Sequence, residues 1–136
     1  GLLTGKYKRG ESGPKGSRHF ERKWKNPPIH DEDKLYNIID TIIEIANNRS
    51  VPPSQISLAW LLSRPTVTSL IIGGRSEKQF SENLPAADLI LSDEELEKLN
   101  KVSKPKLLYP YWHQQFMGKE RFSEADLGLH KWHMGY

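Results

Sequence analysis

The sequence has no cysteine among its 136 residues. A disulfide framework, a thiol nucleophile and a cysteine-ligated metal site are therefore excluded. No run of about 18 apolar residues occurs, so there is no candidate transmembrane helix, and no signal-peptide pattern is present. From these absences we expect a soluble, cytoplasmic protein that has no membrane partner.

Excess charge is also small, because the formal net charge is only +3. The basic residues concentrate between Lys6 and Lys25, where Tyr7, Phe20 and Trp24 also lie. These aromatic residues lack the regular interleaving that a base-stacking surface needs. We expect a solvated loop over 8–31 and no nucleic-acid partner.

Hydrophobic periodicity predicts two long helices in the middle of the chain. Apolar residues recur at three- and four-residue spacing from Leu35 to Ala46, behind Asp31 or a neighbour as the N-cap. A second helix is predicted to begin at Pro52 and Pro53 and to end before Pro65. Its predicted buried residues are Ile56, Ala59, Trp60 and Leu61.

The rest of the chain predicts one strand and two shorter helices. Residues 66–72 are apolar and β-prone, as in a buried parallel strand. A helix carrying Gln79 should end near Leu84, before Pro85. Ser92 and Glu95 have the spacing of a capping box that begins the last helix.

The turn after the predicted strand has the residue types of an anion site. Gly73 and Gly74 permit close backbone approach, and Arg75 can hold a phosphate through two hydrogen bonds. The helix that begins near Ser76 supplies free N–H groups. Paired glycines and a serine cap also occur at ordinary turns, so the pattern alone does not decide between the two interpretations.

Three polar residues follow at helical spacing and share one face beside this turn; they are Gln79, Glu82 and Asn83. Such a face can hydrogen-bond a ribose or an adenine edge. The turn and this face together indicate a nucleotide site.

Several segments resemble the aldo-keto reductases, in particular their aryl-alcohol-dehydrogenase-like branch. They are residues 1–7 (GLLTGKY), 54–62 (SQISLAWLL), 67–83, 86–89 (AADL), 91–96 (LSDEEL) and 109–112 (YPYW). The resemblance covers about 1–112, with a weak match over 7–29, and leaves 113–136 as an aromatic tail. It implies an α/β fold: the C-terminal part of a (β/α)8 TIM barrel, incomplete and mostly helical, with one buried parallel strand.

Such a barrel takes about 250 residues, whereas this sequence has 136 and begins inside a motif. We therefore expect a fragment, a proteolysis product or the ordered remainder of something longer. A mean hydropathy of −0.67 is polar for a self-sufficient core. An apolar face left over for a missing partner, and self-association through it, are expected.

The resemblance implies NADP as cofactor and hydride transfer to a small aldehyde or ketone. By the same resemblance, Gly73 permits backbone approach, Arg75 pairs with the 2′-phosphate, and Gln79, Glu82 and Asn83 bind the adenosine end. Other implied cofactor-binding residues are Gly1, Leu2 and Thr4 under the pyrophosphate, Lys6 and Tyr7 beside it, and Ser17 and Arg18 in a loop over the cofactor.

No catalytic residue is assigned. The family's general-acid Tyr and its supporting Lys, Asp and His belong to the first half of the barrel, so we expect this chain alone to lack catalytic competence. His130 and His133, with Tyr136, lack a convincing third metal ligand, and no metal site is predicted. Two alternatives remain open: a non-catalytic NADP-binding regulatory module, and a truncated, self-associating barrel piece.

Overall fold

The structure is a computed structural model that describes residues 1–11, 13–15, 29–118 and 123–124. The chain divides into two compact units, Gly1–Ser103 and Lys104–Tyr136. The predicted division into 1–112 and 113–136 follows the extent of the family resemblance and stays a prediction. Of the predicted loop 8–31, the described residues have no helix or strand.

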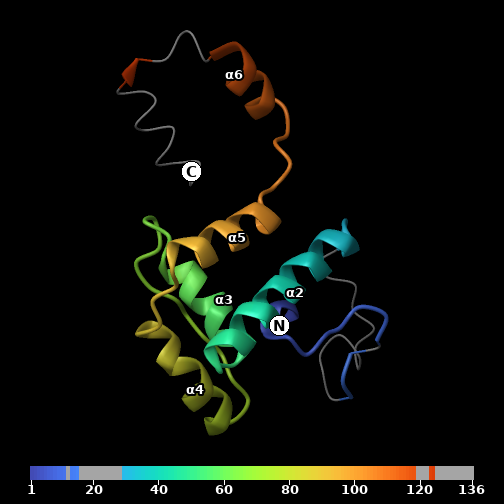
Figure 1. Ribbon diagram of the computed structural model, residues 1–136, viewed down its shortest axis with the longest axis vertical. Helices are drawn as coiled ribbons and strands as arrows, with labels where there is room; N and C mark the ends of the chain where they lie inside the picture. Colours follow the sequence, from blue (N-terminus) through green and yellow to red (C-terminus); the bar gives the residue numbers. More distant parts are fainter. Residues whose placement is uncertain (12, 16–28, 119–122, 125–136) are drawn as a thin grey trace. The chain divides into compact units, whose positions relative to one another are not determined.

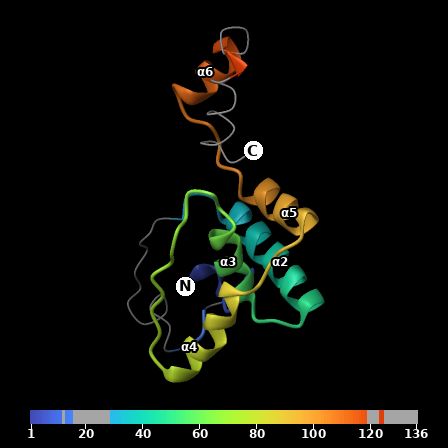
Figure 2. The same cartoon turned by 90° about the vertical axis from the view of Figure 1, so that its left-hand side faces the viewer.

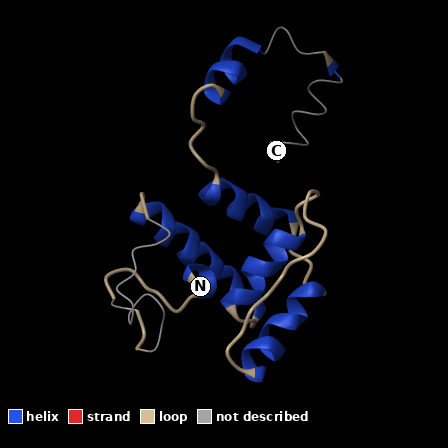
Figure 3. Ribbon diagram, turned by 180° about the vertical axis from the view of Figure 1, so that it is seen from behind, coloured by secondary structure: helices blue, strands red, loops and turns tan. Residues whose placement is uncertain are grey.

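The first unit is built from helices (Figure 3). They are the short 3-10 helix η1 (Leu2–Thr4), α2 (Glu32–Arg49), α3 (Pro53–Leu62), α4 (Glu77–Asn83), the 3-10 helix η2 (Leu84–Ala87) and α5 (Asp93–Ser103). In Figure 1, α2, α3 and α5 lie together, and α4 follows α3 on the side away from α5.

Helix α2 begins where its sequence predicts. The Asp31 side chain accepts a hydrogen bond from the backbone N–H of Lys34 at 2.9 Å, which satisfies one of the free amides of the first turn. At its other end, Ser50 adopts a left-handed conformation with φ 54°, and its N–H donates to the carbonyls of Ala46 and Asn47. The prediction of this helix is confirmed.

The core lies where α2, α3 and α5 meet. Its buried members are Ile42, Ile45 and Ala46 from α2, Ile56 and Ala59 from α3, and Leu91 and Leu99 from the α5 region. Trp60 packs against this cluster and donates from Nε1 to Asn100 Oδ1 at 2.9 Å. The prediction that Leu61 is buried is wrong: it is 37% exposed, because it points about 200° away from Ala59 around the helix.

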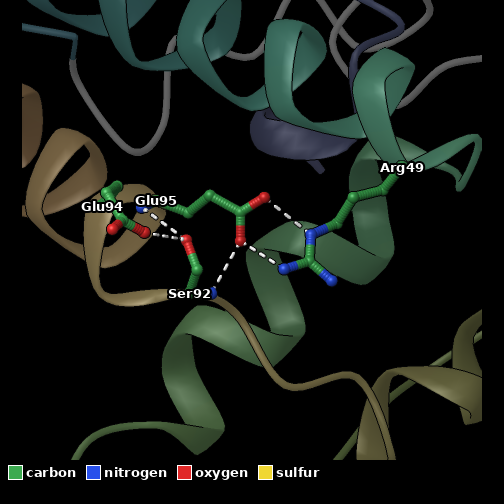
Figure 4. A network of polar contacts seen from close by, with 4 residues as sticks. All are labelled: Arg49, Ser92, Glu94 and Glu95. Carbon is green, nitrogen blue, oxygen red and sulfur yellow. Dashed lines mark hydrogen bonds and ion pairs between the residues drawn. The ribbon is translucent and has the colours of Figure 1, made fainter.

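A polar network joins the C-terminal end of α2 to the start of α5 (Figure 4). Arg49 donates from Nε and Nη2 to the two carboxylate oxygens of Glu95, at 2.6 Å each. Glu95 also accepts from the Ser92 N–H at 2.7 Å, and its own N–H donates to Ser92 Oγ at 3.3 Å. These reciprocal bonds confirm the predicted capping box.

The predicted buried parallel strand at 66–72 is wrong. The described residues contain no strand, and this segment is an irregular connection between α3 and α4 (Figure 2). None of its residues is buried, and Ile71 is fully exposed. The physical reason is that a strand needs a paired neighbour for its backbone, and no described segment provides one.

The second unit contains α6 (Tyr111–Gly118). An aromatic cluster marks its start: the ring centroids of Tyr109 and Trp112 lie 6.3 Å apart, and those of Trp112 and His113 lie 5.7 Å apart, both edge to face.

Within the described ranges, no helix has the length and apolar character needed to cross a membrane.

Candidate functional site

The turn that precedes α4 is exposed and locally well defined. Ser76 is the N-cap, and its Oγ accepts from the Gln79 N–H at 3.4 Å. The two glycines differ in their surroundings. A Cβ at Gly74 would lie 2.9 Å from Phe80 Cε2, whereas a Cβ at Gly73 would meet nothing within 4 Å. Gly74 therefore lets the turn pack on Phe80, and Gly73 leaves the backbone open to approach.

Gln79 reaches back to the turn, a contact that the sequence did not predict. Its Oε1 accepts from the backbone N–H of Arg75 at 2.7 Å. This bond fixes the conformation of the turn while the Arg75 side chain remains on the surface. The Oε1 of Gln79 thus accepts a hydrogen bond within the protein, and its Nε2 group can donate to an acceptor atom of a ligand.

The end of α4 is attached to α3 through Gln55. This buried side chain donates from Nε2 to the backbone carbonyl of Glu82 at 2.6 Å. The Glu82 carboxylate lies 3.8 Å from Lys78 Nζ, one helical turn earlier. The support that Gln55 gives to the end of α4 was not predicted from the sequence. Its signal was a polar residue on the face of the helix that also carries Ile56 and Ala59.

The N-terminal segment packs on the start of α3. Ser57 Oγ donates to the Leu3 carbonyl at 2.9 Å, and Thr4 Oγ1 donates to the Gly1 carbonyl at 2.8 Å. Gly5 follows with φ 74°, and a Cβ there would lie 2.9 Å from Pro53 Cγ. Only glycine accommodates both this conformation and this close approach.

The segment then continues along α2. Tyr7 is buried, and Lys6 Nζ lies 5.3 Å from the centre of its ring. Arg9 donates to Asp33 at 2.6 Å and to Asn37 at 3.1 Å. These contacts hold the residues around Lys6 and Tyr7 against the first turns of α2.

Helix α3 therefore supports both groups of predicted cofactor-binding residues. Gln55 binds the end of α4, and Ser57 binds η1. These two side chains are two positions apart and so point about 200° apart around the helix. The two groups are anchored to different sides of the same helix.

The predicted loop residues Ser17 and Arg18 lie outside the described part of the chain. The same holds for His130, His133 and Tyr136, at which no metal site was predicted. In the part that is described, no three His, Asp or Glu side chains gather as a metal site would require.

The bidentate ion pair of Arg49 and Glu95 involves none of the predicted site residues. The hydrogen bonds from Arg49 lower the pKa of the Glu95 carboxyl. At the turn, by contrast, the exposed Arg75, the open backbone at Gly73 and the Gln79 amide provide a cation and hydrogen-bond donors for an anionic ligand. The described residues thus suit an anionic ligand, and their predicted roles in binding the 2′-phosphate of NADP stay predictions.

Comparison with known proteins identifies the family. The sequence profile described as the Aldo/keto reductase family matches residues 1–104. The chain belongs to the aldo/keto reductase family. The family fold is the (β/α)8 barrel, so the α/β barrel class holds for the family, while the strand predicted at 66–72 is absent here.

Three relatives illustrate the range of the family. A probable voltage-gated potassium channel subunit beta from Arabidopsis thaliana is 36% identical over 111 residues, which is 78% of this chain and 34% of the relative. The aldo-keto reductase yakc of Schizosaccharomyces pombe, whose name includes NADP(+), is 32% identical over 75% of this chain and 29% of its own length.

An L-glyceraldehyde 3-phosphate reductase from Escherichia coli O157:H7 is 35% identical over 105 residues, 74% of this chain and 30% of the relative. The chain therefore spans about a third of the length of the curated relatives that it matches.

Proposed function

We propose that this aldo/keto reductase chain is the cofactor-binding part of an NADP-dependent oxidoreductase that reduces aldehyde or ketone carbonyls. We further propose that it corresponds to the C-terminal part of a (β/α)8 barrel and that the protein is cytoplasmic. The observation that carries the proposal is the family match over residues 1–104, which includes the exposed turn at Gly73–Ser76.

The adenosine end of the cofactor is assigned to this turn and to α4. Arg75 pairs with the 2′-phosphate, because a guanidinium can offer two parallel donors to a phosphate. Gly73 admits the ligand to the backbone, where a Cβ would meet no neighbour. The remaining contacts to the adenosine come from Gln79, Glu82 and Asn83.

The pyrophosphate is assigned to the N-terminal segment. Gly1, Leu2 and Thr4 pass beneath it, and the exposed Lys6 supplies positive charge. Tyr7 is the fixed point beside it, because this side chain is buried. Arg18 is assigned to a loop over the cofactor by the family resemblance alone.

Bound NADPH supplies the hydride that reduces the carbonyl carbon. No residue of this chain is assigned as the proton donor, since the family's Tyr, Lys, Asp and His belong to a part of the barrel that this chain does not match. Catalysis is therefore proposed for the protein extended to the length of its relatives, and the 136 residues alone are expected to bind without turning over substrate.

A ligand titration of the chain tests the adenosine assignment. Adenosine 2′-monophosphate is added to the isotope-labelled protein, with adenosine as the control that lacks the phosphate. Amide shifts of Gly73–Asn83 that occur with the phosphate-bearing probe, and that weaken in Arg75→Met, are expected. Shifts confined to other segments, or equal shifts with both probes, would contradict the assignment.

A second candidate is a non-catalytic NADP-binding subunit that regulates a partner protein. The observation that favours it is that relatives from Arabidopsis thaliana and Oryza sativa, 36% and 35% identical, are named as probable potassium channel subunits beta. NADPH oxidation with a panel of aldehydes and ketones, measured on the extended protein, separates the candidates. Cofactor binding without turnover favours the regulatory subunit.

A further inference from the structure

Helix α3 contacts both groups of residues that are assigned to the cofactor. The adenosine group lies on α4 and the turn before it, and the pyrophosphate group begins at η1. A side chain of α3 donates a hydrogen bond to a backbone carbonyl in each group: Gln55 to Glu82 at 2.6 Å, and Ser57 to Leu3 at 2.9 Å. Neither donor is itself assigned to the cofactor.

The core fixes the orientation of α3. Ile56 and Ala59 are buried in the cluster that α3 shares with α2 and α5, and Trp60 packs against the same cluster. Because successive residues of an α-helix lie about 100° apart, Gln55 and Ser57 flank Ile56 on its two sides. The face of α3 that packs in the core therefore lies between the two donors.

On the α4 side, the hydrogen bond is shielded from water. Gln55 is 7% exposed, so water is a poor alternative partner for its amide group. The 3-10 helix η2 follows α4 directly and also contacts α3, and its Ala86 is buried. The end of α4 is thus tied to α3 at Glu82, one residue before Asn83.

On the η1 side, a close approach accompanies the hydrogen bond. The Ser57 hydroxyl lies nearer to the Leu3 carbonyl, at 2.9 Å, than to the Pro53 carbonyl of its own helix, at 3.2 Å. A Cβ at Gly5 would lie 2.9 Å from Pro53 Cγ. Pro53 and Ser57 are four positions apart and share one face of α3. This face therefore holds the N-terminal segment at both Leu3 and Gly5.

We propose that Gln55 and Ser57 are positioning residues for the cofactor, which set the spacing between the groups that bind its adenosine end and its pyrophosphate. This inference rests on the proposed function. A ligand that contacts two groups at once gains the full benefit of the second contact only when their separation matches its own span. Since α3 holds that separation before the cofactor arrives, less ordering is needed on binding.

The two donors should affect ligands of different length differently. Gln55→Leu releases the end of α4 and should weaken binding of both adenosine 2′-monophosphate and NADPH. Ser57→Ala releases η1 and should weaken NADPH alone, because adenosine 2′-monophosphate lacks the pyrophosphate. Each loss should be roughly 2- to 10-fold, since a positioning hydrogen bond can change affinity by no more than its own net contribution.

Calorimetric titration with adenosine 2′-monophosphate and with NADPH tests the inference, on the protein extended to the length of its relatives. Ser63→Ala is the matched control for Ser57→Ala, because the Ser63 hydroxyl also donates to a backbone carbonyl, that of Trp60 at 2.8 Å, but stays within the end of α3. Circular dichroism verifies that each variant retains its helices. Ser57→Ala removes only a partly exposed hydroxyl, so the inference stays testable even if Gln55→Leu does not fold.

The expected result is a loss for NADPH alone in Ser57→Ala and for both ligands in Gln55→Leu, with Ser63→Ala equal to the parent. Unchanged affinities in Ser57→Ala and Gln55→Leu would overturn the inference, as would equal losses for both ligands in Ser57→Ala. A parent protein that binds neither ligand would overturn the proposed function, and this inference with it.

Discussion

Arg49 and Glu95 form a two-point ion pair, with both donor–acceptor distances at 2.6 Å. The residues are 46 positions apart and join the end of α2 to the start of α5. Their side chains are 30% and 18% exposed. A paired guanidinium and carboxylate in this partly buried setting contribute more to stability than an ion pair on the open surface.

Arg49→Met should therefore lower the free energy of unfolding by about 1.5 to 3 kcal/mol, the range for hydrogen bonds to charged groups. Lys98→Met is the matched control, because Lys98 also joins α5 to α2, through Glu44, but in a pair more than half exposed. Its effect should stay below about 1 kcal/mol. Chemical denaturation measures both, and equal losses would contradict the assigned role of Arg49.

The same pair predicts how stability depends on pH. The hydrogen bonds from Arg49 lower the pKa of Glu95 in the folded state below its ordinary value of 4.5. The unfolded chain therefore binds the proton more readily, and the stability from this carboxylate is present above pH 4.5 and lost as pH falls through the folded-state pKa. Glu95→Gln should be less stable at neutral pH and lose less on acidification, as measured by denaturation midpoints. Parallel pH profiles of parent and variant would contradict this.

Gly5 and Gly10 have the same backbone conformation, so substitutions at these two positions distinguish the cost of backbone strain from the cost of close packing. Gly5 and Gly10 have φ 74° and 75°, but only Gly5 faces a close neighbour, because a Cβ added there would lie 2.9 Å from Pro53 Cγ. Gly10→Ala should cost about 1 to 2 kcal/mol, the usual strain of a left-handed residue. Gly5→Ala should cost more, because η1 must also move away from α3. Thermal unfolding of the two variants measures the difference, and equal losses would argue against tight packing of η1.

Gln55 is predicted to hold α4 in place. Gln55→Leu keeps the approximate size of the side chain but removes the 2.6 Å hydrogen bond to the Glu82 carbonyl. We expect a loss of about 1 to 2 kcal/mol and faster amide exchange in α4, because its last turn loses a partner. Ser57→Ala serves as the control, since it releases η1 rather than α4. Faster exchange of α4 in the control, or none in Gln55→Leu, would contradict this role.

Helix ends were predictable because their causes are local. Asp31, Ser76 and Ser92 each lie just before a helix and accept a hydrogen bond from an amide three residues later. Such bonds depend on residue type and short spacing alone. The sequence therefore located these helices well without knowledge of the tertiary structure.

The absence of a strand at 66–72 was not predictable in the same way. The composition of this segment favours a strand, but a strand forms only when another segment pairs with its backbone. Nothing in the residues themselves says whether that partner is available. The contacts of Gln55 with Glu82 and of Arg49 with Glu95 were missed for the related reason that they join distant positions.

The candidate site was predicted in part. The sequence located the glycine turn, its serine cap and the family, and the structure places Arg75 and Gly73 on the surface. The sequence did not show that Gln79 accepts a hydrogen bond from the Arg75 amide. Residue spacing indicates the helix face on which a side chain lies, but not whether that side chain reaches back to the preceding turn.

The preference of the protein for NADPH over NADH tests the assignment of Arg75 to the 2′-phosphate. Dissociation constants for both cofactors are measured by calorimetry for the parent and Arg75→Met, each extended to the length of the relatives, with Lys78→Met as the control for loss of a nearby exposed cation. The parent should prefer NADPH, and Arg75→Met should weaken NADPH binding by roughly 10- to 150-fold, equivalent to about 1.5 to 3 kcal/mol, with little change for NADH. An unchanged preference in Arg75→Met would contradict the assignment.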